Sequence, residues 1–324
     1  MAAKTEATKE KMGNIHVLSY HMSNQIAAGE VVHRPSSVLK ELMENSLDAG
    51  STSIRVMVEE GGKRNIQIID NGGGMDEIDA YMCFERHATS KITSETNLQD
   101  IQTLGFRGEA LASISSVAQV HLRTRTADQE AGQYVYITAS KIKQRDPITT
   151  PVGSNFSIKN LFYNLPARSK FLGSATAEMR HILQVFQAIA LSHPEVEFSL
   201  SELKGNKTRQ IYKLPKASLI KRIGGIFRTF QKKKLVPVEH KTTDFQIKGY
   251  VGFPSEAKRY RGEQYFFVNK RYVKSGYLHH AVMKAYQGLL PEGYYPFYVF
   301  FFDIPHQEID VNIHPAKTEV KFKD

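Results

Sequence analysis

The sequence predicts an α+β fold in which helices cover one face of a β-sheet, followed by a smaller α/β domain. An amphipathic helical stretch at residues 38–48 precedes two strand-like segments at 53–58 and 65–69. A long helix with apolar periodicity is predicted at 179–190. With 324 residues, 41% of them hydrophobic, the chain is long enough for roughly two domains with proper cores.

The helix at residues 38–48 presents three polar groups on one side. Glu41, Asn45 and Asp48 stand at i, i+4 and i+7, and a helix has about 3.6 residues per turn, so they share a face. A carboxylate there can act on a water as a general base, and an amide oxygen suits a hard cation such as magnesium. Taken alone, the pattern is more typical of the solvated face of an ordinary amphipathic helix.

Two strands and a glycine turn follow this helix. Residues 53–58 alternate apolar and polar side chains, Gly61-Gly62 marks a turn, and 65–69 form the returning strand. The sequence D-N-G-G-G at 70–74 comes next. Glycine lets a backbone approach a flat ligand closely, and an ionised Asp70 can accept a hydrogen bond from the exocyclic amine of adenine. By itself, a glycine-rich hairpin end is the simpler interpretation.

A second glycine loop, G-F-R-G-E at 105–109, runs into a good helix former. Helix N-termini offer free N–H groups and a positive dipole end to phosphates. The string R-H-A-T-S-K at 86–91 is rich in donors and cations, and residues 75–103 show little periodicity, so a mobile lid is expected there. The chain lacks GxxxxGK[ST], HExxH and paired CxxC motifs, which leaves P-loop and zinc sites without support.

The rest of the chain continues the α+β pattern. A turn at 204–207 is expected to close a hairpin. Further strands are predicted at 154–159, 197–203, 245–252, 264–269 and 298–303, and a further helix at 278–287.

Five longer strings carry a family resemblance. They are NQIAAGEVV at 24–32, ENSLDAG at 44–50, RHATSK at 86–91, GFRGEALASI at 105–114 and DVNIHPAK at 310–317. The helix with Glu41, Asn45 and Asp48, the glycine turn after Asp70 and the glycine-rich lid resemble the GHKL ATPases, a group that includes gyrase B, the ninety-kilodalton heat-shock chaperones and histidine kinases. Within the group the chain is similar to the MutL family of DNA mismatch repair ATPases, from about residue 15 to 322.

The resemblance implies an architecture. A GHKL (Bergerat-type) ATPase sandwich is expected over residues 15–215, followed by a smaller α/β transducer-like domain over 216–324. Residues 1–14 are expected to form a disordered leader. MutL proteins usually carry a separate dimerisation domain, in some lineages a metal-dependent endonuclease, so the chain is expected to be an N-terminal part.

The resemblance also implies a site for ATP and Mg²⁺. Glu41 corresponds to the general base, Lys317 to a lysine that the second domain extends to the γ-phosphate, and Asn45 to the metal ligand. Ser154 stands where the family usually has threonine near the adenine, a change expected to matter little. The implied ATP contacts are Asn45, Asp48, Asp70, Gly72, Gly74, Thr89, Ser90, Lys91, Gly105, Phe106, Arg107, Gly108, Glu109, Ala110, Leu111 and Ser154.

Positive charge is concentrated in the last third of the chain. Residues 201–324 hold 23 Lys and Arg against 11 Asp and Glu, a net of +12, whereas the first 200 residues have a net of −2. A basic stripe without a base-reading motif predicts salt-sensitive binding to the DNA backbone. Solubility is the alternative explanation of such charge. The basic runs are Lys221-Arg222, Lys232-Lys233-Lys234, Lys258-Arg259, Arg261 and Lys270-Arg271.

Three of these cations are predicted to contact DNA: Arg261, Lys270 and Arg271. The resemblance implies a groove arginine at Arg271. The family usually has glycine at the position of Lys270, so this chain adds a positive charge beside that arginine.

The sequence therefore predicts an ATP-dependent DNA mismatch repair protein that binds and slowly hydrolyses Mg-ATP as a switch, with lid closure and dimerisation. By resemblance its partners are DNA, a mismatch-sensor protein, a downstream helicase or nuclease, and a second copy of the chain. Two alternatives stay open. One is the ATPase part of another GHKL machine such as a type II topoisomerase, and the other is a non-enzymatic DNA-binding scaffold.

Cysteine content and hydropathy limit the compartment. A single cysteine, Cys83, allows no internal disulfide and fits a reducing environment. No apolar stretch approaches the roughly 20 residues of a membrane span, so no membrane partner is expected. The expected location is cytoplasmic, with the nucleoid, for a bacterial protein, and nuclear for a eukaryotic one.

Overall fold

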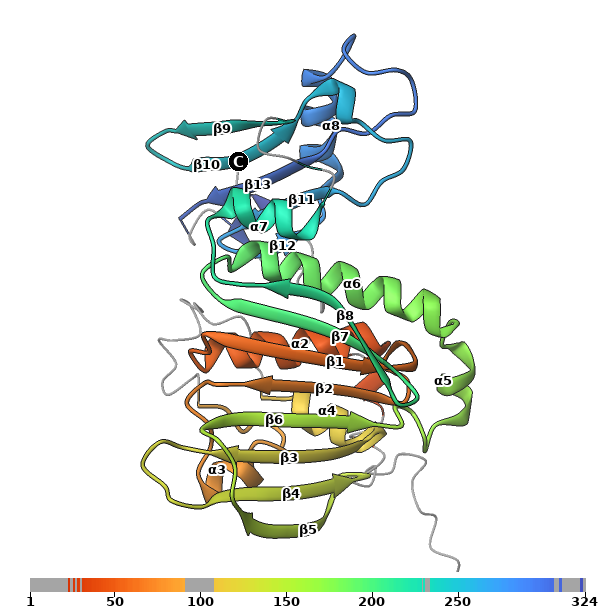
Figure 1. The fold of residues 1–324 in the computed structure, drawn as a ribbon, viewed down its shortest axis with the longest axis vertical. Coiled ribbons are helices and arrows are strands. Elements are labelled where there is room, and N and C mark those ends of the chain that lie inside the picture. Colours follow the sequence, from red (N-terminus) through yellow and green to blue (C-terminus); the bar gives the residue numbers. More distant parts are fainter. Residues whose placement is uncertain are drawn as a thin grey trace, which may run out of the picture.

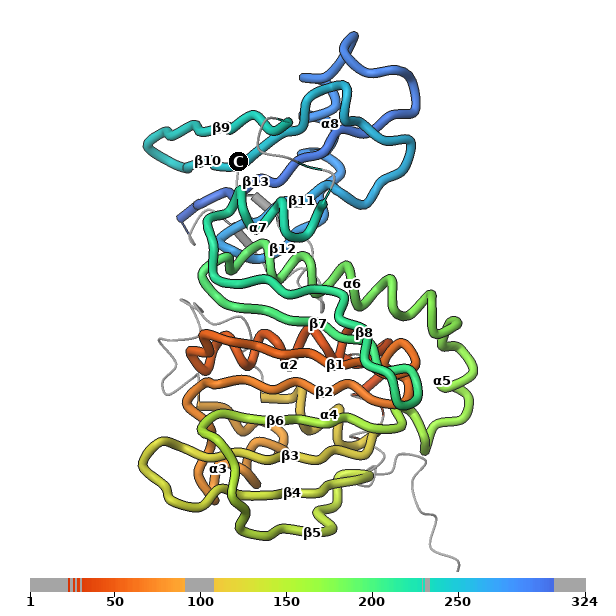
Figure 2. The backbone as a smooth tube through the Cα atoms, viewed as in Figure 1, coloured from red at the N-terminus to blue at the C-terminus, as the bar shows by residue number. Residues whose placement is uncertain are grey.

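The fold is built on two β-sheets that lie one beyond the other along the long axis of the molecule (Figure 1). The tube in Figure 2 traces the chain from the larger sheet at the N-terminal side to the smaller one. The computed structural model describes residues 31–90, 108–228, 230, 234–305, 309–310 and 321–322, together with Ser23, Ile26, Ala28 and Gly29.

The larger sheet is mixed, and nearly all of its strand pairs are antiparallel. Among the strands described in this larger sheet, only β1 and β7 run parallel to each other. In sheet order the strands are β5 (Lys141–Ile148), β4 (Gly132–Thr138), β3 (Gln119–Arg125), β6 (Gly153–Lys159), β2 (Asn65–Asp70), β1 (Ser53–Glu59), β7 (Glu197–Lys204) and β8 (Lys207–Leu214).

Helices cover one face of this sheet, and Figure 1 shows α2 and α4 behind the strands. The helix α2 begins with a proline, whose fixed φ suits the first helical turn, and packs against β2 and α6. Its buried side chains include Val38, Leu39, Leu42 and Met43. The helices of this part are α2 (Pro35–Asp48), η1 (Glu60–Gly62), α3 (Glu77–Met82), α4 (Ala110–Val117), α5 (Pro166–Phe171) and α6 (Ala175–Ser192).

The smaller sheet has the order β12-β11-β13-β10-β9, with β11 and β13 parallel. Its strands are β9 (Leu235–Lys241), β10 (Gln246–Gly252), β11 (Gln264–Val268), β12 (Arg271–Val273) and β13 (Tyr298–Asp303). The accompanying helices are α7 (Leu219–Ile226), η4 (Pro254–Glu256) and α8 (Gly276–Ala285), and a short strand pair joins β14 (Ile309–Asp310) to β15 (Lys321–Phe322).

One hydrophobic cluster extends across both sheets, and a second, smaller cluster lies in the C-terminal sheet. Phe227, Phe297 and Tyr265 of the C-terminal part belong to the same buried cluster as Phe186 and Phe198. Such a continuous apolar contact resists relative movement of the two parts.

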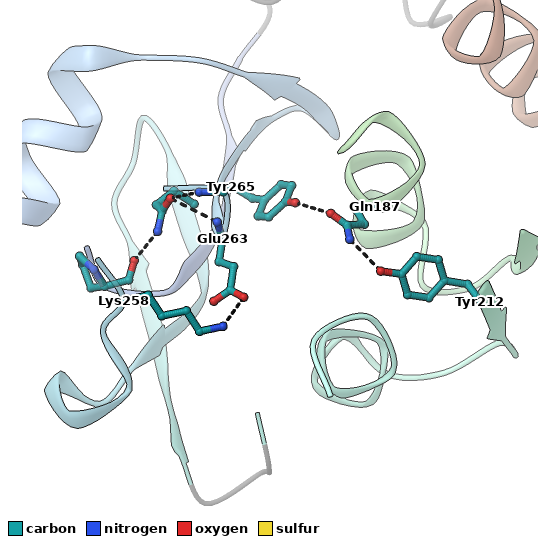
Figure 3. Close-up of polar contacts among 8 residues, drawn as sticks. Gln187, Tyr212, Lys258, Glu263 and Tyr265 are labelled. Atoms are coloured by element: carbon teal, nitrogen blue, oxygen red, sulfur yellow. Dashed lines mark hydrogen bonds and ion pairs between the residues drawn. The ribbon is translucent and has the colours of Figure 1, made fainter. Parts of the chain in front are cut away.

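A polar bridge crosses the same boundary (Figure 3). The hydroxyl of Tyr265 on β11 donates to Oε1 of Gln187 on α6 at 3.0 Å. The amide of Gln187 in turn donates to the hydroxyl of Tyr212 on β8 at 2.8 Å. Buried polar groups need such partners, so the bridge fixes β11 against α6.

The predicted α+β architecture is confirmed, and so are the predicted strands and helices named above, with differences of at most four residues at their ends. One prediction was wrong in part, because residues 77–82 of the expected irregular segment form α3. Asp76 caps α3 by accepting from the N–H of Asp79. The helix is too short to show periodicity, and Ala80 is its one buried residue. The domain boundary at 215/216 falls between β8 and α7 and stays a prediction.

Arg222 does not belong to the basic surface in which the sequence placed it. Its side chain is only 1% exposed. The guanidinium donates to the carbonyl oxygens of Ala190, Pro194, Val196 and Pro215 at 2.7–3.1 Å. Burial lowers its pKa to about 10. Arg222 therefore links the end of α6 to the start of β7, and its guanidinium is buried rather than exposed on a basic surface.

Across the described ranges, no helix is long and apolar enough to cross a membrane.

Replacing Arg222 with methionine should lower the free energy of unfolding by about 3 kcal/mol, because buried carbonyl groups lose a charged donor. Urea denaturation followed by circular dichroism measures this. Lys221→Met, one residue earlier on α7 and exposed, is the matched control and should change stability by about 0.5 kcal/mol or less. Equal losses in the two variants would contradict the buried role.

Candidate functional site

The site is organised around the carboxylate of Asp70 at the end of β2. Side chains alternate along a strand, so Asp70 follows Ile66 and Ile68 on the face toward the core. It is 8% exposed. Its Oδ2 accepts from the hydroxyl of Ser46 on α2 at 2.8 Å. Its Oδ1 accepts from the backbone N–H groups of Gly72 at 3.0 Å and Ser154 at 3.2 Å.

Thr124 continues this polar cluster from the neighbouring strand β3. It is fully buried and donates to the carbonyl oxygen of Gly153 at 3.0 Å. It also accepts from the N–H of Met75 at 2.9 Å. The hydroxyl of Ser154 lies 3.1 Å from that of Thr124. Because Thr124 has only one hydroxyl proton, Ser154 is the donor in that pair.

The glycine turn after Asp70 packs tightly on the end of β3. Gly74 has φ +71°, and a Cβ there would overlap the carbonyl oxygen of Arg125. The N–H of Gly73 donates to the carbonyl oxygen of Ala49, just beyond α2, at 3.0 Å. The turn is thus held between the end of α2 and β3, beside the buried carboxylate.

Another side of α2 carries the three residues that the sequence predicts to form the catalytic wall of the site. Glu41, Asn45 and Asp48 are half-buried. Lys40 lies 2.8 Å from the carboxylate of Glu44 and 3.4 Å from that of Glu41. Burial would lower the pKa of Lys40, but these two carboxylates more than offset it and raise the pKa above its ordinary value. Lys40 is therefore a firmly charged partner in this row of acids.

Two predicted phosphate-binding segments lie side by side. The imidazole of His87 is 3.7 Å from the carboxylate of Glu109. A Cβ on Gly108, whose φ is +60°, would overlap the carbonyl oxygen of Ala88. The loop that bears Thr89 and Ser90 therefore contacts the residues that lead into α4. Ala110 and Leu111 form the first turn of α4, which carries no acidic residue.

Several predicted site residues lie outside the described part of the chain. They are Lys91, Gly105, Phe106, Arg107 and Lys317.

The three cations predicted to contact DNA lie near the two ends of β11. Arg261 is exposed, precedes β11, and lies 4.7 Å over the ring of Tyr295. Lys270 is exposed at the other end of β11 and lies 3.5 Å from the carboxylate of Glu195. Arg271 is half-buried.

Sequence reasoning missed Ser46 and Thr124. Both could have been predicted, because each is a polar residue at a position where the pattern of the helix or strand predicts a buried apolar one. Ser46 lies one turn beyond Leu42 on the buried side of α2, and Thr124 follows Leu122 on the buried face of β3.

The residues of the site fit a magnesium ion that is coordinated mainly by a bound substrate and only in small part by the protein. Among the described residues, no group of three or more His, Cys, Asp or Glu could hold a metal ion. Magnesium is commonly bound by one or two protein oxygens together with substrate phosphates. A single amide oxygen such as that of Asn45 matches that mode.

Two family profiles match the chain. The profile "Histidine kinase-, DNA gyrase B-, and HSP90-like ATPase" matches residues 33–161, and "DNA mismatch repair protein, C-terminal domain" matches residues 223–324. The first match covers α2, the Asp70 turn and α4, and the second covers the smaller sheet.

Relatives and solved structures agree with these profiles. MutL of Flavobacterium psychrophilum is 48% identical over 96% of this chain and 50% of its own length, and MutL of Bacteroides fragilis is 48% identical over 96% and 49%. The chain thus spans about half the length of the curated relatives it matches. The Aquifex aeolicus MutL ATPase domain complexed with ADP is 29% identical, with a TM-score of 0.63, over 85% of this chain and 93% of that one. The N-terminal domain of a DNA repair protein has a TM-score of 0.79 at 25% identity, over 92% of both chains.

The fold and the Asp70 turn define an ATPase domain of the GHKL class, followed by a mismatch-repair domain. The chain belongs to the MutL family of DNA mismatch repair proteins.

Replacing Ser46 with alanine should lower the free energy of unfolding by about 1–2 kcal/mol, because a buried carboxylate oxygen loses its donor. Thermal and urea unfolding measure the loss. Ser115→Ala is the control: Ser115 is also buried and bonds to the carbonyl of Ala112 in its own helix, as Ser46 does to that of Leu42 at 3.1 Å, but Ser46 also bonds to Asp70. If both variants were equally stable, the Ser46–Asp70 bond would contribute nothing measurable.

Proposed function

We propose that this chain binds Mg-ATP between α2, the Asp70 turn and the start of α4, and hydrolyses it slowly as a switch in DNA mismatch repair. The observation that carries the proposal is the buried carboxylate of Asp70. Hydrogen bonds from Ser46, Gly72 and Ser154 hold this carboxylate in place. Ser46 belongs to α2, the helix that also presents Glu41 and Asn45.

Asp70 is suited to read adenine. A carboxylate offers about four acceptor positions, and the bonds described above occupy two on Oδ1 and one on Oδ2. One position on Oδ2 is left for the exocyclic amine. Since the other three donors fix its direction, the carboxylate needs no reorganisation when the base binds. Gly72 and Gly74 would let the backbone approach the ring, and Ser154 would lie at its edge.

The phosphates would lie toward the first turn of α4. Free N–H groups at a helix N-terminus attract phosphate oxygens, and Gly108, Glu109, Ala110 and Leu111 provide this start. Thr89 and Ser90 would close on the same phosphates from the adjacent loop. The roles of Lys91, Gly105, Phe106, Arg107 and Lys317 rest on the family resemblance.

Hydrolysis mainly requires charge neutralisation and an in-line water. Bound magnesium would neutralise phosphate charge, and Asn45 would supply one of its oxygen ligands. Glu41 would orient the water and take its proton. Asp48 would act within the same polar face, one turn beyond Asn45. If Lys317 reaches the γ-phosphate from the domain proposed at 216–324, the site over 15–215 is complete only with both parts in place, which links nucleotide state to conformation.

The wider role follows the family. MutL membership argues against the topoisomerase alternative, and a scaffold without ATP binding stays testable. A nucleotide-dependent homodimer, a mismatch-sensor protein, and a downstream helicase or nuclease are proposed as partners. DNA would be bound by its backbone through Arg261, Lys270 and other exposed cations, with Arg271 as the family's groove arginine.

Glu41→Ala should lower kcat for ATP by about 10²–10⁴-fold, because a general base is lost, while ATP still binds. This variant should therefore accumulate as a dimer with Mg-ATP, as measured by light scattering after size exclusion. Asn45→Ala should instead lose magnesium-dependent binding. Glu60→Ala, an exposed glutamate paired with Arg64, is the control. Parent-rate hydrolysis by Glu41→Ala would refute the base assignment, and no ATP binding by the parent chain would favour the scaffold.

Arg261→Gln and Lys270→Gln should each weaken DNA binding and reduce the slope of log K against log salt by about 1. Fluorescence anisotropy with two unrelated duplex sequences measures both effects, which should not depend on sequence. Lys141→Gln, on the exposed edge strand β5 of the large sheet, is the control. Unchanged slopes for both variants would place the DNA surface elsewhere.

A further inference from the structure

The candidate general base Glu41 has a charged neighbour on its own helix. The ammonium of Lys40 donates to Oε1 of Glu41 at 3.4 Å, and each side chain is 26% exposed. Within the described ranges of the chain, no other side chain forms a hydrogen bond with this carboxylate. A general base works only when its carboxylate points at the proton that it takes. Lys40 therefore bears directly on the orientation of Glu41.

Lys40 is held in turn by a second and closer carboxylate. Its ammonium donates to Oε2 of Glu44, one turn further along α2, at 2.8 Å. Residues four apart on a helix are neighbours. Glu44 is only 14% exposed, so solvent screens this pair less than a pair at an open surface. Because this contact is the shorter of the two, Glu44 is the main anchor of the ammonium and fixes it beside Glu41.

One ammonium thus serves two partly buried carboxylates. It carries three donors on a compact charge, so it can bond to both at once. Burial lowers the pKa of Lys40, but the charges and hydrogen bonds of Glu44 and Glu41 outweigh this effect and raise the pKa above its ordinary value. Without the ammonium, two like charges three residues apart on one helix would repel each other. Glu41 would lose the contact that fixes its direction.

The position of the helix itself does not depend on Lys40. It is set by buried apolar side chains such as Leu42 and Met43, and by the bond from Ser46 to Asp70. The part of Glu41 that these contacts leave free is its side chain. This is the part that Lys40 contacts.

We propose that Lys40 is a positioning residue for ATP hydrolysis: anchored by Glu44, its ammonium holds the carboxylate of Glu41 in the direction from which it acts on the attacking water. The inference rests on the proposed role of Glu41 as general base. Lys40 acts through Glu41 and touches neither the water nor the nucleotide.

This role predicts a specific kinetic pattern. Adenine is read by Asp70 on β2, which Lys40 does not contact, so nucleotide binding should survive its loss. A misdirected base should slow the chemical step, since a misplacement near 1 Å can cost about 10²-fold in rate. Loss of Lys40 should therefore lower kcat much more than it raises KM.

The test compares Lys40→Gln, Lys40→Arg, Glu44→Gln and Lys213→Gln in the full 324-residue chain. Lys40→Gln should lower kcat by about tenfold or more with KM for ATP changed by less than about threefold. Lys40→Arg, which keeps the charge, should recover part of the loss. Glu44→Gln should lower kcat by a smaller factor and add little in the Lys40→Gln background. Lys213→Gln, an exposed lysine on β8, should match the parent.

A second comparison shows whether Lys40 acts through the base. In a Glu41→Ala background, Lys40→Gln should not lower the residual rate further. Equal losses in both backgrounds, or parent kcat in Lys40→Gln, would overturn the inference and leave the proposed function intact. Parent-rate hydrolysis by Glu41→Ala would instead refute the base assignment itself.

ADP binding, measured by calorimetry, separates positioning from a general defect of the fold. Lys40→Gln should bind ADP within about threefold of the parent, because the contacts of Asp70 are unchanged. A loss of ADP affinity as large as the loss of kcat would show that Lys40 only maintains the structure, which would also overturn the inference.

Discussion

The buried carboxylate of Asp70 is the constraint on which the rest of the site depends. A charged group with 8% exposure is costly unless donors surround it. Those donors come from three directions: α2 through Ser46, the glycine turn through Gly72, and β6 through Ser154. Satisfying one charge therefore fixes the helix, the turn and the central strands relative to one another. A site for a flat, amine-bearing ligand follows from the same geometry.

The sequence made the centre of this arrangement predictable, because periodicity and polarity coincide there. In β2, β3 and α2 an apolar repeat ends in a polar side chain: Asp70, Thr124 and Ser46. Of these three, the sequence predicted only Asp70 as a site residue, because three glycines follow it. Ser46 and Thr124 obeyed the same rule and were predictable in principle.

Other parts were not readable from local pattern. The edge strand β5 is exposed along almost its whole length, and its residues do not alternate between buried and exposed. Its strand conformation is therefore determined by pairing with β4 rather than by its own sequence pattern. Arg222 shows the same limit for charge. Nothing in the run Lys221-Arg222 distinguishes the exposed lysine from the arginine that is buried against four carbonyl oxygens. The fold class could be predicted from the sequence. Whether each lysine or arginine is exposed or buried could not, because that depends on tertiary contacts.

The two-residue turn before Arg271 combines local backbone strain with tertiary contacts. Lys270 adopts φ of 66°, a region that costs a non-glycine residue about 1–2 kcal/mol. The bonds of Asn269 to Ile304 and the ion pair of Lys270 with Glu195 hold that conformation. A two-residue turn of this kind matches the twist of a hairpin and leaves little freedom in the direction of β12. The strain is therefore retained where it fixes the direction of β12 at the boundary between the two sheets.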